Sequence, residues 1–237
     1  MTTYRGNAIA VGVLFILCSA ASILSIVPLG AAVGAPVDFA NLAANDNRVV
    51  LTALIEFIWA ATGMGIAIGL YPVLRKFNPA LALGSVAGRV VENVLILVGT
   101  LSLLVLLTVS QRAAGSAVPS SFQAIGDALV AVRDWVHGFV AMIPFGIGVF
   151  MYYVVLYRSR LVPRWLSGWG LVAAVLSTVG VVYAGFTQDF GFTTVTIVLS
   201  IPIALQEMAL AVWLIAKGFS RTALASLAPA CGSGGSS

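Results

Sequence analysis

The chain has 237 residues, of which 60% are hydrophobic and only 8% are charged. An ordinary soluble domain carries roughly 25% charged residues. Twelve basic and eight acidic side chains could not cover the surface of a soluble domain of this size. Together with a mean hydropathy of +1.07, these values exclude a soluble protein and indicate a polytopic membrane protein. The net charge of +4 requires no nucleic-acid partner, because an unequal distribution across a membrane accounts for it.

Six runs of mainly apolar residues are each long enough to cross a hydrocarbon core of roughly 30 Å, which takes about 20 residues. The spans must be helices, because a lipid-exposed strand would leave its backbone groups without hydrogen bonds. The sequence therefore predicts an all-α fold, a six-transmembrane-helix bundle that forms one domain over residues 1–231. The expected spans are residues 8–30, 49–73, 82–109, 135–157, 165–186 and 192–216.

Charge differs sharply between the two sides of the predicted bundle. One side has no acidic residue, and the other carries all five aspartates together with Arg48, Arg112 and Arg133. The positive-inside rule places the basic side in the cytoplasm, so both termini are expected there. The expected location is the inner (cytoplasmic) membrane of a bacterium, with membrane lipid as a partner. The basic side carries Arg5, Arg75, Lys76, Arg158, Arg160, Arg164, Lys217 and Arg221.

Three features lie outside this pattern of spans. Residues 110–134 contain a helical pattern that either lies on the outer leaflet or extends the fourth span. Residues 232–237 read GSGGSS, which resembles a flexible linker added for expression, and they are excluded from the fold. Cys18 lies in the first span and Cys231 in the tail, so no disulfide framework is expected.

Four charged residues fall inside predicted spans. They are Arg89 and all three glutamates of the chain, Glu56, Glu92 and Glu207. A charged side chain at mid-membrane costs at least roughly 2.5–3.5 kcal/mol, so each of these residues needs a physical explanation. At a rise of about 1.5 Å per helical residue, all three glutamates lie near the membrane midplane.

Arg89 and Glu92 stand three residues apart, and Asn93 follows, so all three share one face of a helix. Arg89 stays charged, and either Glu92 or Glu207 can neutralise it. Because one arginine neutralises at most one carboxylate, the other two glutamates are candidates for a raised pKa and a bound proton. A protonatable carboxyl at this depth suits a proton-coupled carrier, and it equally suits a structural hydrogen bond between helices. Glu207, Glu92, Arg89, Glu56 and Asn93 are therefore the candidates for a ligand or proton site.

Proline and glycine add two further signals. Pro144 and Pro202 lie within the fourth and sixth spans, and each frees the carbonyl four residues earlier, that of Val140 or Val198. Broken helices near the midplane are where transporters place substrates, although proline also occurs in ordinary spans. Residues 84–88 read as G-x-x-x-G, which favours close helix packing in a membrane.

His137 is the only histidine of the chain, which excludes bis-histidine haem and histidine-rich metal sites. It is expected about one turn inside the outer boundary, beside Asp134 and Trp135, as an interfacial residue or as a secondary site candidate. No G-x-S-x-G, Walker or dinucleotide-binding motif is present. We therefore expect no metal, no cofactor and no assigned catalytic residue, and lean away from an enzyme.

Three stretches carry a resemblance to a known family. They are Arg89-Val-Val-Glu92, residues 152–170 with their Pro-Arg-Trp-Leu segment, and residues 207–219 from Glu207 to Phe219. In order and spacing, over residues from about 50 to 220, the chain resembles a bacterial six-helix inner-membrane family that is catalogued only as a domain of unknown function. The resemblance implies the fold and the membrane, and it carries over no activity, cofactor or catalytic residue.

Three functions remain in competition at this point. The first is a small carrier or receptor that binds an apolar or amphipathic ligand at the mid-membrane Arg/Glu cluster. The second is a non-catalytic scaffold or partner subunit, in which the cluster only fixes helix packing. The third and weakest is an intramembrane enzyme that uses a glutamate or His137 as a general base. A homo-oligomer is left open.

Overall fold

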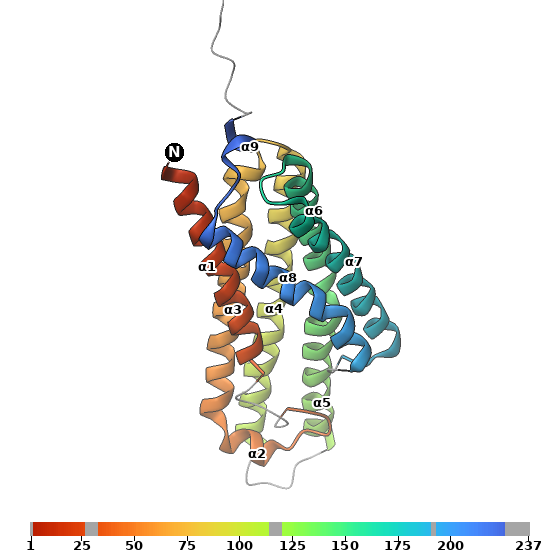
Figure 1. Ribbon diagram of the computed structural model, residues 1–237. Helices are drawn as coiled ribbons and strands as arrows, with labels where there is room; N and C mark the ends of the chain where they lie inside the picture. The colour runs from red at the N-terminus through yellow and green to blue at the C-terminus, as the bar shows by residue number, and fades with distance from the viewer. Residues whose placement is uncertain (1, 27–32, 114–119, 191–192, 226–237) are drawn as a thin grey trace, which may run out of the picture.

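Every regular element in the part of the chain that the structure describes is a helix (Figure 1). The structure is a computed structural model that describes residues 2–26, 33–113, 120–190 and 193–225, so the GSGGSS segment and Cys231 lie outside the described residues. Six helical segments are long and apolar enough to cross a membrane, which confirms the six-helix membrane bundle. The elements are α1 (Thr2–Leu24), α2 (Phe39–Ala44), α3 (Asp46–Leu74), α4 (Pro79–Ala113), α5 (Ser120–Trp135), the π-helical segment η2 (Val136–Val140), α6 (Met142–Ser159), α7 (Arg164–Thr187), α8 (Thr194–Ala216) and α9 (Arg221–Ala225).

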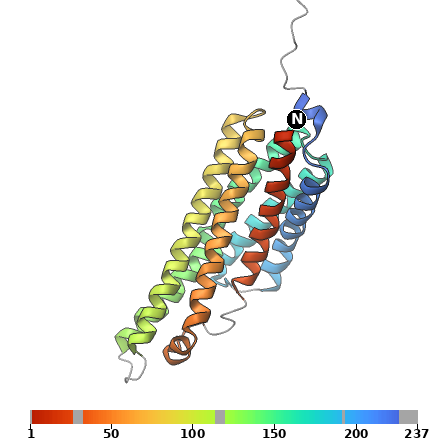
Figure 2. The ribbon, with the colours of Figure 1, turned by 90° about the vertical axis from the view of Figure 1, so that its left-hand side faces the viewer.

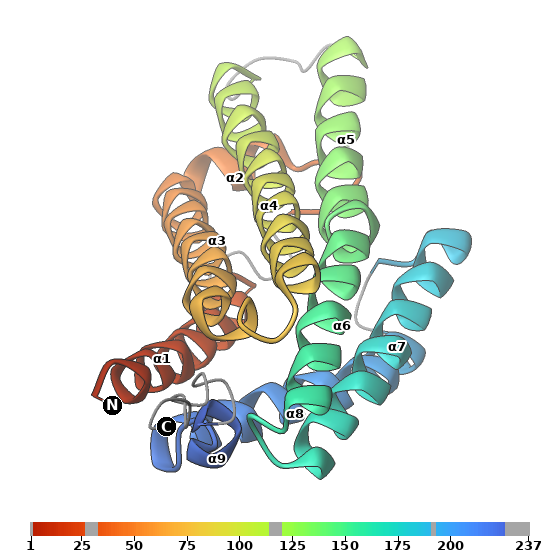
Figure 3. The same cartoon turned by 90° about the horizontal axis from the view of Figure 1, so that it is seen from above.

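The long helices pack in chain order around a closed ring. Each helix contacts the next from α1 through α3, α4, α6 and α7 to α8, and α8 returns to α1. Seen along the bundle, α1, α8 and α7 border one side of the ring (Figure 3), and α8 crosses the others obliquely (Figure 1). The start of α1 and α9 lie at one end of the bundle, here called the terminal end, and α2 lies at the other, here called the distal end (Figure 2).

The basic residues of the expected cytoplasmic side gather at the terminal end, where α1 and α7 begin and α3, α6 and α8 end. Arg5 donates hydrogen bonds to the carbonyls of Ile215 (2.7 Å) and Ala216 (3.2 Å), and a cation is favourable at the C-terminus of a helix. Lys76 donates to the Tyr4 hydroxyl. The predicted unequal distribution of charge is thus present in the fold, while the side of the membrane that it faces stays a prediction.

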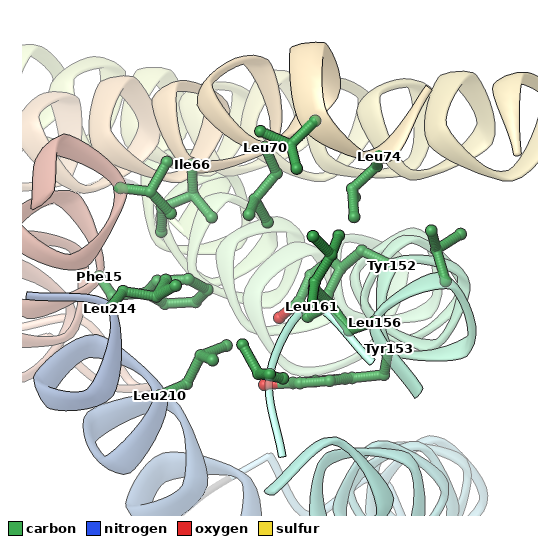
Figure 4. Packing of buried hydrophobic residues seen from close by; sticks show 14 of the residues in the cluster. Phe15, Ile66, Leu70, Leu74, Tyr152, Tyr153, Leu156, Leu161, Leu210 and Leu214 are labelled. Atoms are coloured by element: carbon green, nitrogen blue, oxygen red, sulfur yellow. The ribbon is translucent and has the colours of Figure 1, made fainter. Parts of the chain in front are cut away.

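The terminal half of the ring is filled by a large apolar core. Side chains of α1, α3, α6 and α8, among them Phe15, Leu70, Tyr152 and Leu210, meet in its centre (Figure 4). A glycine contact lets α4 approach α6: a Cβ on Gly88 would lie 2.8 Å from the Pro144 carbonyl oxygen and from the Gly148 Cα. This contact confirms the close packing that the G-x-x-x-G pattern predicted.

The first span differs from the prediction at both ends. The helix begins at Thr2 and ends at Leu24, whereas residues 8–30 were expected, and residues 27–32 lie outside the described part. Its polar start is held by Asn7, whose amide donates to the Gly69 carbonyl (2.6 Å). At its end, the Ser22 and Ser25 hydroxyls bond the carbonyls three residues earlier. Such local bonds compete with the helical ladder.

The fourth span is longer than expected, because α5 continues it towards the distal end. Of the two interpretations of residues 110–134, the extended span is therefore correct for residues 120–134, whereas residues 110–113 end α4 and residues 114–119 lie outside the described part. The Ser102 hydroxyl of α4 donates to the Leu129 carbonyl of α5 (2.7 Å). Asp127 accepts hydrogen bonds from the Val37 backbone (3.0 Å) and the Gln123 amide (3.1 Å). These contacts hold α5 against α4 and the segment before α2.

Candidate functional site

Glu56 lies at the centre of a polar cluster in the distal half of the bundle. The residue is fully buried on α3. Its carboxylate accepts hydrogen bonds from the Thr100 hydroxyl of α4 (2.7 Å) and from both terminal nitrogens of Arg133 of α5, with 3.2 Å to Nη1. Glu56, Thr100, Arg133 and His137 are here called the distal cluster. A buried carboxylate that is paired and hydrogen-bonded in this way can remain charged.

This pairing differs from the prediction that Arg89 neutralises one carboxylate and leaves the other two glutamates without a cation. Arg133 was assigned to the outer side of the bundle, together with the aspartates. Because α5 extends the fourth span, the Arg133 side chain is only 15% exposed and reaches Glu56. Glu56 is therefore not one of the carboxylates left without a cation.

A π-helical segment places His137 beside Glu56. Within η2 the Ala141 N–H donates to the Val136 carbonyl five residues earlier (2.9 Å). Pro144 has no N–H for the Val140 carbonyl, so the ladder must change its spacing or lose a bond. The freed Val140 carbonyl thus marks a change of helix type. By contrast, α8 runs unbroken through Pro202, which does not support a broken helix there.

The His137 ring leaves one nitrogen without a partner. Its Nδ1 lies 3.1 Å from the Arg133 carbonyl oxygen, and because a carbonyl can only accept, Nδ1 carries the hydrogen. Nε2 is buried, has no hydrogen bond within the described residues, and lies 3.8 Å from Glu56 Oε1. The ring packs on Gly99, where any Cβ would collide with it. The secondary candidate is therefore held inside the bundle, against the carboxylate.

A cavity of about 720 Å³ opens beside this cluster. Glu56, Arg133, Asp134 and His137 form part of its wall, and Trp59 stands next to them, with its ring centroid 6.0 Å from that of His137. The rest of the lining is formed mainly by apolar residues, serines and a threonine of α1, α7 and α8, together with Met142 of α6 and Phe190. The volume lies within the range of ligand pockets, about 300–1,000 Å³, and the mixture of an apolar wall with a few polar groups is typical of them.

A second polar cluster lies nearer the terminal end, around Arg89. Arg89 Nη1 lies 2.9 Å from Glu92 Oε2 and 3.2 Å from Oε1, and both residues are buried. The Asn93 amide donates to the Arg89 carbonyl (2.7 Å). The Arg89 guanidinium also lies 5.0 Å from the centre of the Phe145 ring. The predicted pair and the predicted place of Asn93 are confirmed.

Glu207 belongs to the same neighbourhood but makes no ion pair there. Arg89 and Tyr152 are the polar groups that act on its carboxyl, and the Tyr152 hydroxyl has no regular hydrogen bond in the described residues. The adjacent Gln206 is fully engaged, since it accepts from the Tyr153 hydroxyl and donates to the Leu166 carbonyl (3.0 Å). Arg89, Glu92, Asn93 and Glu207 are here called the central cluster. Of its two carboxyls, Glu207 is the one without a cation within salt-bridge distance.

Cys18 lies between the central cluster and a residue of the cavity wall. Arg89 Nη2 donates to the Cys18 sulfur (3.9 Å), and the thiol lies 3.9 Å from the carbonyl of Trp59, a residue that lines the cavity. Glu207 stands one turn after Ala204, which also lines the cavity. The central cluster therefore lies behind residues of the cavity wall, and none of its own members lines the cavity.

Sequence reasoning missed Arg133, Thr100 and the cavity itself. One signal was available, because Arg133 and His137 stand four residues apart on a helical pattern and so share a face. No group of three or more His, Cys, Asp or Glu residues that could hold a metal ion occurs among the described residues. The groups that face the cavity can supply hydrogen bonds and charge.

Comparison with known proteins places the chain in a family. No curated protein and no solved structure matches it significantly. The family model described as "Domain of unknown function (DUF4386)" matches residues 10–218, nearly the whole of the six-helix bundle. The polar positions on which the resemblance rested, Arg89, Glu92 and Glu207, lie within the match. The chain therefore belongs to the DUF4386 family of membrane proteins of unknown function.

Proposed function

We propose that the protein is a small carrier or receptor that binds an amphipathic molecule in the distal cavity. The observation that carries this proposal is the cavity of about 720 Å³ with the buried Glu56–Arg133 pair and the unpartnered His137 Nε2 at its wall. A polar group buried without a partner is costly. A ligand that fills the cavity and hydrogen-bonds this nitrogen removes that cost.

The cavity wall favours a ligand whose polar end donates hydrogen bonds and carries positive charge. With the hydrogen on Nδ1, the neutral His137 ring offers a lone pair at Nε2. Among the charged residues of the wall, the guanidinium of Arg133 is outnumbered by the carboxylates of Glu56 and Asp134. The remaining lining accepts a hydrocarbon chain. An amine on a hydrocarbon chain donates hydrogen bonds, carries a positive charge and fits the apolar part of the lining.

The test compares octylamine, octanol and octanoate, which share one chain length and differ in their polar end. We expect octylamine to raise the melting temperature of the purified protein most and octanoate least. The phenylalanine variant Ala204→Phe fills the cavity from α8 and should abolish the shift. The control Val212→Phe lies on the same helix outside the cavity lining and should keep it. Equal shifts with all three probes, or in both variants, would contradict the proposal.

The scaffold function is favoured by one different observation, the tight packing around Arg89. The guanidinium is held by Glu92 and faces Phe145, and the Gly88–Gly148 contact lies one residue away. If the central cluster only fixes helix packing, its variants should lower the melting temperature and leave amine affinity unchanged. Changes in affinity without changes in stability would favour the carrier or receptor.

We also propose that the bundle lies in a bacterial inner membrane with its terminal end in the cytoplasm. The support is the collection of basic residues at that end, where no acidic residue of the described chain lies. Asn47→Cys at the distal end and Thr222→Cys at the terminal end are both exposed positions. In a background in which Cys231 is replaced by serine, an impermeant thiol reagent should label only Asn47→Cys in intact cells. Labelling of Thr222→Cys alone would reverse the orientation.

A further inference from the structure

A second pocket, of about 700 Å³, lies at the terminal end, between the α6–α7 and α8–α9 connections. Four basic residues line it, and we call it the basic pocket. They are Arg160, Arg164, Lys217 and Arg221, accompanied by Trp213 and Phe219. The two connections are tied together by a hydrogen bond from the Ser220 N–H to the Leu161 carbonyl (2.8 Å). The basic residues are thus brought together by the backbone of the fold.

The charges of this pocket are not neutralised by the described part of the chain. All eight acidic residues of the protein lie in the spans or towards the distal end, and none of the four basic side chains forms a salt bridge within the described residues. Arg164 makes one polar contact, its guanidinium lying 5.4 Å from the centre of the Tyr157 ring. Because like charges at close range repel each other, an anion between them stabilises this arrangement.

The backbone adds further positive potential. Arg164 is the first residue of the 24-residue helix α7, and the N-cap residue before it, Pro163, provides no side-chain hydrogen bond. The first N–H groups of a helix are free to bind an anion, and the helix dipole favours negative charge there. An anion in the basic pocket therefore meets guanidinium, ammonium and backbone donors together, a combination that suits the several oxygens of a phosphate group.

Aromatic residues place the pocket at the level of lipid headgroups. Trp165 is 61% exposed, and Tyr157, whose ring lies against the Arg164 guanidinium, is also exposed. Tryptophan and tyrosine are enriched where a membrane protein passes from hydrocarbon to water. Basic pockets at this level, between spanning helices, are suited to anionic headgroups.

We propose that the basic pocket binds the phosphate of an anionic phospholipid headgroup. The phosphate lies among Arg160, Arg164, Lys217 and Arg221, and the acyl chains extend past Trp165 along the outside of the bundle. This site shares no lining residue with the distal cavity, which is lined by two carboxylates and one guanidinium. A free phosphate ion shares the headgroup chemistry but lacks the acyl chains, so the two are separable by experiment.

The experiment uses the delipidated full chain in a neutral detergent and three probes: dioctanoyl phosphatidylglycerol, dioctanoyl phosphatidylcholine and inorganic phosphate. We expect phosphatidylglycerol to raise the melting temperature and to remain bound in native mass spectrometry, with little effect from the other two. The double variant Lys217→Gln/Arg221→Gln should weaken phosphatidylglycerol binding more than ten-fold, at roughly five-fold per charge.

The matched control is Arg75→Gln/Arg158→Gln, which removes two positive charges from the same end without touching the pocket lining. It should bind phosphatidylglycerol within about two-fold of the unchanged protein, since exposed charges away from a site contribute little. Equal loss in both double variants would overturn the proposal, because general attraction to the surface would then explain the binding. An equal response to inorganic phosphate would overturn the assignment to a lipid. Melting curves without lipid show that each variant is folded.

Discussion

Two Arg–Glu pairs lie inside the bundle, and they differ in what they join. Arg89 and Glu92 are three residues apart on α4, so their helix alone brings them together. Glu56 and Arg133 are 77 positions apart on α3 and α5, so their contact exists only once the helices have assembled. The first pair offsets the cost of burying two charged side chains that lie on the same helix. The second pair also connects two helices and forms the wall of a cavity, and this difference suggests separate roles.

Arg89→Leu is the change with the largest expected effect on this comparison. It leaves the buried Glu92 without a cation, and breaking a buried pair costs about 3–5 kcal/mol. The free energy of unfolding from denaturant titration in detergent is the measurement. Arg89→Leu/Glu92→Leu should be milder than the single change. If the two effects simply add, the residues are not coupled, and Glu207 becomes the better partner for Arg89.

Arg133→Leu should cost less, about 2–3 kcal/mol, although it also removes a buried pair. The cavity reaches its partner Glu56, so water can replace part of the lost interaction. The same titration measures the cost, and Glu56→Leu/Arg133→Leu provides the paired control. A loss as large as that of Arg89→Leu would show that water does not reach the distal cluster.

Gly88→Ala tests the packing beside the central cluster. The new methyl group would lie 2.8 Å from backbone atoms of α6, and forcing the helices apart should cost about 1–2 kcal/mol. Gly168→Ala is the control, because its methyl group would meet only the Tyr157 ring at 3.6 Å. We expect the melting temperature to fall for Gly88→Ala alone. A fall of equal size in the control would mean that the α4–α6 contact has no special role.

Glu207→Gln is expected to change stability least, by about 0.5 kcal/mol or less. Glutamine keeps the size of the side chain and its ability to bond Tyr152, and no ion pair is lost in the described residues. Glutamine cannot release a proton. If Glu207 titrates when octylamine binds, the affinity of the unchanged protein should depend on pH and that of the variant should not. The measurement is an octylamine titration at two pH values. Unchanged pH dependence would show that Glu207 is not a proton site, and a much lower melting temperature would make it structural.

The fold could be predicted because its determinants are local. Hydrophobic length locates six spans, and the spacing of Arg89, Glu92 and Asn93 on one helix predicts their contact. Arg133 escaped prediction because its partner depends on how far α5 continues the fourth span. The sequence left two positions open for the helix in residues 110–134, and only the packing of α5 (Ser120–Trp135) against α4 shows that residues 120–134 continue the fourth span.

The sequence predicted His137 only as an interfacial residue or a secondary site candidate. Its position against Glu56 also depends on how the fourth span is built. Periodicity assumes about 3.6 residues per turn, and η2 departs from that spacing immediately before Pro144. The proline was a visible signal of an irregular helix, but its consequence for the neighbouring histidine required coordinates. The cavity is formed by six separate stretches of chain, and it had no signature in any one of them.

The π-helical turn at Val136–Val140 also rotates the two halves of its span relative to each other about the helix axis. One additional residue turns everything beyond it by about 100°. The distal half can therefore present Arg133 to α3, while the terminal half presents Gly148 to α4. In a uniform α-helix, the directions in which Arg133 and Gly148 point from the helix axis would be fixed by 3.6 residues per turn alone. The single π-turn therefore lets one span contact α3 through Arg133 and α4 through Gly148 at a relative rotation that a uniform helix would not give.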